Sequence, residues 1–181
     1  MVRMRALGTV AISTLLIGVA TLSASGEMLG TLGGPGCTIS GTTRNDELRG
    51  TDGRDVICTG RGDDFIEGMG GNDLIYAGPG SDLVDAGFGA DTISGGGGPD
   101  ILLGEEGPDD LSGGPGRDDV RGGLGRDRIA GGSGNDRCLS AIDDHPGDDV
   151  IGGPGNDTAD YDPGDDVRSV EHHVPFFCFG E

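Results

Sequence analysis

A nine-residue repeat is the feature that most constrains what this chain can fold into. The repeat runs in one unbroken frame from Gly41 to Leu139. Glycine fills the fourth position of every copy except the first, which has Arg44, and an aliphatic residue fills the eighth position of every copy except the last, which has Cys138. The sixth position is always aspartate: Asp46, Asp55, Asp64, Asp73, Asp82, Asp91, Asp100, Asp109, Asp118, Asp127 and Asp136. A fixed short period of this kind predicts a solenoid.

Each copy divides into a turn and a strand. The first six residues, such as Gly113 to Asp118, are rich in residues that tolerate positive φ, and the last three, such as Leu83 to Asp85, favour an extended strand. Two copies then make one coil, with residues of successive coils stacked in parallel about 4.8 Å apart. The sequence therefore predicts an all-β fold: a parallel β-roll, or right-handed β-solenoid, with two nonapeptides per coil and irregular N- and C-terminal caps.

The stacked sixth-position aspartates need positively charged partners. The chain has 32 acidic against 12 basic residues, 40 glycines and no tryptophan, a composition that without the period is typical of a disordered chain. One aliphatic side chain per copy makes a thin core, and stacked carboxylates repel one another unless cations lie between them. Oxygen ligands on flexible, glycine-rich turns favour Ca²⁺ over Mg²⁺ or transition metals. The formal charge of −20 argues against nucleic-acid binding.

The spacing also predicts how many ions bind. Alternate copies place their aspartates on opposite edges, so the two ladders of aspartates offer five and four gaps. One ion in each gap gives about nine calcium ions, whose charge nearly balances that of the acidic chain. The alternative is a merely solvated acidic edge, which the strict period and the glycine two residues before each aspartate disfavour.

Three copies carry a family resemblance: GGPGRDDVR, GGSGNDRCL and AGPGSDLVD. They resemble the GGxGxD nonapeptide of RTX, or haemolysin-type, calcium-binding repeats. The resemblance is strong over 41–139 and extends weakly to about Val170. It implies a β-roll that binds calcium through the sixth-position aspartates and the turn carbonyls and is disordered without calcium. Arg44 departs from the pattern and weakens the case for a site at Asp46.

Irregular segments flank the array. Residues 27–40 keep the frame without its aspartate and are predicted to form an N-terminal cap. The frame breaks after Leu139, and degenerate repeats follow over 140–170, with Asp149 and Asp157 as further sixth-position metal ligands. The tail, 171–181, is predicted to cover the open end of the solenoid, and a docking peptide is the alternative.

The N-terminus indicates export. Residues 1–26 combine Arg3 and Arg5 with an apolar run and a small-residue end, the layout of a secretory signal peptide, and an uncleaved anchor is the alternative. We therefore expect an extracellular protein with no membrane span after cleavage. Four cysteines fit an oxidising compartment, and the preferred pairs are Cys37–Cys58 and Cys138–Cys178, one at each end of the array.

Together these features predict a secreted, non-catalytic module that binds several calcium ions and folds when they bind. The HExxH and GxSxG motifs are absent, which argues against an enzyme. One alternative is a calcium-dependent adhesin that binds an unidentified cell-surface or extracellular partner. A module associated with a toxin or an enzyme is the less favoured one.

Overall fold

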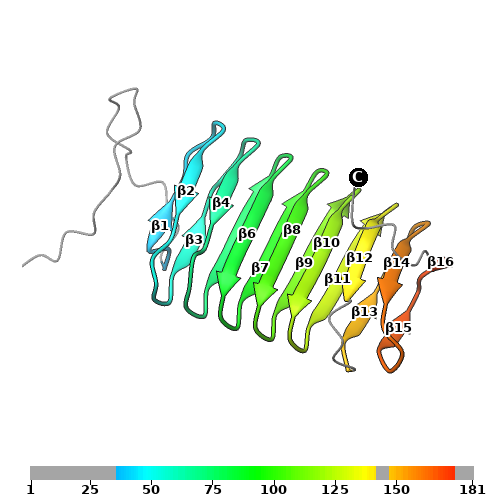
Figure 1. Ribbon diagram of the computed structural model, residues 1–181. Helices are drawn as coiled ribbons and strands as arrows, with labels where there is room; N and C mark the ends of the chain where they lie inside the picture. Colours follow the sequence, from blue (N-terminus) through cyan, green and yellow to red (C-terminus); the bar gives the residue numbers. More distant parts are fainter. Residues whose placement is uncertain (1–35, 142–146, 174–181) are drawn as a thin grey trace, which may run out of the picture.

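The chain folds into two parallel sheets that face each other along one rod (Figure 1). The computed structural model describes residues 36–141 and 147–173. One sheet holds β1 (Ile39–Ser40), β3 (Val56–Cys58), β5 (Leu74–Pro79), β7 (Thr92–Gly97), β9 (Asp110–Gly116), β11 (Arg128–Gly134), β13 (Asp149–Ile151) and β15 (Asp166–Arg168). The other holds β2 (Glu47–Arg49), β4 (Phe65–Glu67), β6 (Leu83–Phe88), β8 (Ile101–Glu106), β10 (Asp119–Leu124), β12 (Arg137–Ala141), β14 (Thr158–Tyr161) and β16 (His172–His173).

The strand register confirms two nonapeptides per coil. Each strand pairs with the strand two further along the chain, so Ile75 lies between Ile57 and Ile93 in one sheet. Consecutive strands therefore alternate between the sheets, and the coils follow one another from the N-terminal to the C-terminal end of the rod (Figure 1). The predicted all-β solenoid is confirmed. The described residues form no helix, and so none that could cross a membrane.

The core is a single column of small and medium apolar side chains between the sheets. The eighth position of each copy supplies most of them, because alternation along a strand turns that residue inward. The buried column comprises Leu48, Ile57, Ile66, Ile75, Val84, Ile93, Leu102, Leu111, Val120, Ile129, Leu139, Val150 and Ala159. Such a narrow core contributes little hydrophobic stabilisation for each residue that is ordered.

One member of this column departs from the repeat frame. Cys138 stands at the eighth position of its copy, yet Leu139 is the fully buried residue that pairs with Ala159 of β14. The register between β10 and β12 shifts at this point, and Cys138 adopts a φ of 53°. The bulge adds one residue to β12 and moves the next side chain into the core.

The disulfide predicted at the start of the array is present. Cys37 and Cys58 are bonded and close a loop across the first coil. Cys138 is buried, whereas its expected partner Cys178 lies outside the described residues, as do the predicted signal segment and the end of the tail.

Candidate metal centre

The sixth-position aspartates are joined from coil to coil by hydrogen bonds. From Asp46 to Asp118, the backbone N–H of each of these aspartates donates to Oδ1 of the aspartate 18 residues further on. Examples are Asp64 to Asp82 (2.8 Å), Asp73 to Asp91 (2.7 Å) and Asp82 to Asp100 (2.9 Å). The sixth-position aspartates from Asp55 to Asp136 all have buried side chains. One oxygen of each carboxylate is therefore used to hold successive coils together along both edges of the rod.

The second oxygen of most of these carboxylates has no such role. Within the described residues Oδ2 accepts no hydrogen bond in Asp64, Asp73, Asp82, Asp91, Asp100, Asp109, Asp118, Asp136 and Asp157. A buried polar atom normally has a hydrogen-bond partner. Leaving a buried charged atom without one costs on the order of several kcal/mol, as when one member of a buried ion pair is removed. A regular row of unpaired anionic oxygens is therefore the strongest structural indication of bound cations.

The glycine at the first position of the turn leaves space beside this oxygen. A methyl group built on Gly95 would lie 2.7 Å from Asp100 Oδ2 and 2.8 Å from the carbonyl oxygen of Gly113 in the next coil. At Gly131 the distances are 2.5 Å to Asp136 Oδ2 and 2.8 Å to the Gly152 carbonyl oxygen. A carboxylate oxygen and a carbonyl oxygen thus border one small volume, which is the hard donor chemistry that calcium prefers.

Three copies fill this space with a side chain. Thr59, Ala77 and Ala86 replace the first-position glycine and are buried. The Thr59 hydroxyl donates to the Ala77 carbonyl oxygen. Among the described residues no three His, Cys, Asp or Glu side chains cluster around a common point, so an ion here would depend on one carboxylate per rung together with backbone carbonyls.

The buried carboxylates resist ionisation in the metal-free fold. Burial raises the pKa of Asp73, Asp82 and Asp118 to about 6 and the pKa of Asp100 and Asp109 to about 7. The N–H donated by the preceding rung opposes this rise, and the neighbouring carboxylates of the ladder add to it. A cation bound in place of the protons would offset both the cost of burying the charged carboxylates and their mutual repulsion.

In the first two copies of the repeat, the protein itself supplies hydrogen-bond donors to Oδ2 of the ladder aspartate. Asp46 Oδ2 accepts from Thr42 through the backbone N–H (2.6 Å) and the hydroxyl (2.9 Å). Asp55 Oδ2 accepts from the same two groups of Thr51, at 2.8 and 2.9 Å. The sequence signal was threonine at the second position of these turns, where glycine is the commonest residue later in the array.

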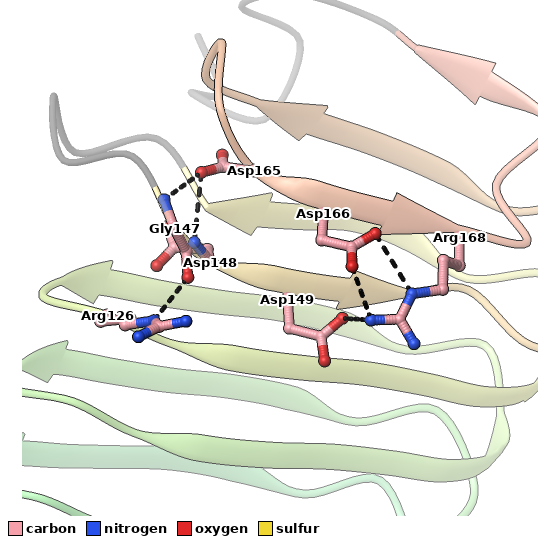
Figure 2. A network of polar contacts seen from close by, with 7 residues as sticks. All are labelled: Arg126, Gly147, Asp148, Asp149, Asp165, Asp166 and Arg168. Atoms are coloured by element: carbon pink, nitrogen blue, oxygen red, sulfur yellow. Dashed lines mark hydrogen bonds and ion pairs between the residues drawn. The ribbon is translucent and has the colours of Figure 1, made fainter.

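After the insertion the ladder resumes one residue earlier than predicted. Asp127 N–H donates to Oδ1 of Asp148 (2.7 Å), which is buried, so Asp148 and not Asp149 takes the sixth position. The insertion lengthens this coil from 18 to 21 residues. Asp149 instead begins β13, where its carboxylate pairs with Arg168 at 3.0 Å, and Arg168 also contacts Asp166 (Figure 2).

Two further acidic residues, which the period did not identify, end the ladders. Asp165 Oδ1 accepts from the N–H groups of Gly147 (3.0 Å) and Asp148 (3.2 Å) (Figure 2). On the other edge Asp157 lies at its predicted position, accepting from Asp136, and donates its own N–H to Glu171 Oε2 (2.8 Å). Each ladder thus ends on a carboxylate that is less buried than those before it.

Comparison with protein families agrees with this geometry. A family model described as the RTX calcium-binding nonapeptide repeat matches the chain in four copies, over residues 38–66, 59–93, 67–102 and 103–138. No curated protein matches the chain in a sequence search. The matched copies cover most of the two ladders and both of their threonine-closed rungs.

Proposed function

Because the chain belongs to the family of RTX calcium-binding nonapeptide repeats, we propose that it is a secreted β-roll that folds when several calcium ions bind along its ladders. The observation that carries this proposal is the row of buried Oδ2 atoms without a hydrogen-bond donor. The repeats and the solenoid support a calcium-binding structural module. Secretion, calcium-gated folding and the absence of catalysis are our proposals.

The two oxygens of each aspartate have separate tasks in this mechanism. Oδ1 receives the N–H of the preceding coil and sets the stacking of the turns. Oδ2, together with the first-position carbonyl of the next coil, would hold calcium, as at Asp100 and Gly113. The charge of the ion would balance the negative charge of the buried carboxylates. An ion that binds only the folded chain adds its binding free energy to folding.

We assign the ions to the rungs from Asp64 onward. Asp46 and Asp55 are closed by threonine and have the least need of a cation. Between Asp64 and Asp157 the two ladders still offer about nine gaps for ions, and the side chains of Thr59, Ala77 and Ala86 narrow the gaps beside Asp64, Asp82 and Asp91. Extracellular calcium modules bind in roughly the 10⁻⁴–10⁻³ M range, so the chain would remain unfolded where calcium is scarce and fold outside the cell.

A calcium titration of the purified protein, followed by far-UV circular dichroism, tests the folding mechanism. We expect a cooperative gain of β-structure as calcium rises toward millimolar, with magnesium failing to substitute, and native mass spectrometry should count the bound ions. A spectrum that is fully folded in chelator and unchanged by calcium would contradict the mechanism.

Export is tested separately. Protein recovered from the medium of an expressing culture should have lost roughly the first 26 residues, as N-terminal sequencing would reveal. Recovery of the intact chain in the membrane fraction would favour the uncleaved anchor.

A further inference from the structure

The basic residues of this acidic chain lie on either side of a central stretch that has none. The chain has no lysine, and no arginine or histidine lies between residues 62 and 116. Several arginines then follow within about twenty residues, and two of them, Arg117 and Arg137, lie on the same edge of the rod.

These two arginines line one shallow cleft of about 330 Å³. We name it the arginine cleft; its lining residues are Arg117, Asn135, Arg137, Asn156 and Thr158. Neither arginine has an ion-pair partner within the described residues, whereas Arg121 and Arg168 pair with aspartates on the outer faces of the sheets. No carboxylate lines the cleft. It therefore presents unneutralised guanidinium groups to solvent.

The cleft is extended along the rod. Asn135 and Asn156 occupy equivalent turns of successive coils, and the Asn156 N–H donates to Asn135 Oδ1 at 3.0 Å. Arg137 in β12 and Thr158 in β14 lie in the next column of residues, toward the sheet. Successive coils repeat at about 4.8 Å, so guanidinium, amide and hydroxyl groups follow one another in a line. Such a line suits an elongated ligand that carries both oxyanions and hydroxyl groups.

We propose that the arginine cleft binds an acidic glycan through its sulfate or carboxylate groups. Guanidinium groups match these planar or tetrahedral oxyanions with two parallel N–H donors, and asparagine and threonine can bind sugar hydroxyls. The remainder of the rod, with its acidic central third, repels a long polyanion, which localises binding to this end. This inference rests on the proposed function, because only the folded roll brings the lining residues of three coils together.

Calcium would also change the charge beneath the cleft. Arg117 directly precedes Asp118, and Arg137 directly follows Asp136, both of which are buried ladder residues. Where these carboxylates are ionised and no cation is bound, they lower the positive potential of the two arginines without forming ion pairs with them. Calcium on the same rungs would leave the arginines as the dominant charge of this surface, so glycan binding should require calcium.

Calorimetric titration in millimolar calcium tests the proposal. The probes are dextran sulfate, polygalacturonate, neutral dextran and sodium sulfate. The test variant is R117Q/R137Q, with R137Q alone as a milder second variant. The matched control is R54Q/R61Q, which removes the same charge from exposed arginines near the other end of the rod. Circular dichroism in the same buffers reports whether each protein folds.

We expect dextran sulfate or polygalacturonate to bind and neutral dextran not to bind. R117Q/R137Q should weaken binding at least about tenfold, with R54Q/R61Q close to the unchanged protein. Equal binding by both double variants would overturn the proposal, and sodium sulfate binding as tightly as the polymer would replace the glycan with the free ion. Calcium-induced folding without glycan binding defeats this proposal alone, whereas no calcium-induced folding defeats the proposed function as well.

Discussion

Replacing one ladder aspartate by asparagine should have opposite effects in the presence and absence of calcium. Asp100 lies in the middle of its ladder, is 1% exposed, and has a pKa raised to about 7 by burial. In Asp100→Asn the side-chain oxygen can still accept the N–H of Asp82. The amide group replaces Oδ2 in the small volume that the Gly113 carbonyl oxygen also borders. The variant therefore keeps the coil-to-coil bond and removes the buried charge.

The pKa gives the size and the sign of the effect. An unfolded aspartate loses its proton near pH 3.8, whereas Asp100 in the metal-free fold retains its proton up to about pH 7. The folded state binds more protons between these values, so its stability falls as pH rises through that window and stays low above it. At about 1.4 kcal/mol per pKa unit, ionised Asp100 destabilises the metal-free roll by on the order of 4 kcal/mol at pH 8.

The assay follows folding in chelator, driven by the osmolyte trimethylamine N-oxide and monitored by far-UV circular dichroism. At pH 8, Asp100→Asn should fold at a lower osmolyte concentration than the unchanged protein, and at pH 5 the difference should fall to less than about half, because only the unfolded aspartate is ionised there. In calcium the variant should bind one or two fewer ions and need more calcium to fold. Asp110→Asn, at an exposed position at the start of β9, is the control for charge. Destabilisation by Asp100→Asn at both pH values in chelator would refute the reasoning.

Three further predictions concern the turns, the pH and the disulfide. Gly113→Ala should raise the calcium concentration at which half of the protein is folded, and should destabilise the folded roll by about 1–3 kcal/mol in urea unfolding, because its methyl group would meet Asp118 Oδ2. Gly97→Ala has open space around the added methyl group and should change little. Calcium affinity should fall steeply below about pH 6–7, with proton release on binding detectable in weakly buffered titrations, because the ladder carboxylates regain protons there; a flat profile between pH 5 and 8 would contradict the raised pKa values. Cys58→Ser opens the loop closed with Cys37 and should lower the free energy of unfolding by about 3 kcal/mol in calcium, and no change on reduction of the unaltered protein would show that the first coil needs no such link.

The regular part of the molecule could be predicted from its period. Once aspartate and an aliphatic residue recur every nine positions, the alternation of a strand decides which side chains enter the core. The coil size, the position of Ile75 between Ile57 and Ile93, and the alignment of aspartates along two edges all follow from that spacing.

The ends could not be predicted in this way, because a period carries no register across an interruption. Asp148 and Asp149 are adjacent, and only the length of the loop between β12 and β13 decides which of them joins the ladder. The bulge at Cys138 and the threonine bonds of Asp46 are likewise local solutions that depend on contacts between coils. Asp165 lies in a Pro-Gly-Asp-Asp-Val segment that repeats the one around Asp148, whereas Glu171 shows no repeat signal because it ends the pattern instead of continuing it.

The direction of the hydrogen bonds between aspartates makes the rod modular in a specific unit. From Asp46 to Asp118, each ladder aspartate is bonded to a carboxylate that lies 18 residues later in the chain, as Asp82 is to Asp100. Removing or duplicating 18 residues inside the array would recreate the same junction on both edges. Removing nine residues would move every downstream repeat to the opposite edge of the rod. Asp165 and Glu171 would then each end the other ladder. Gene variation and protein engineering should therefore change the length of this rod by whole coils and not by single nonapeptides.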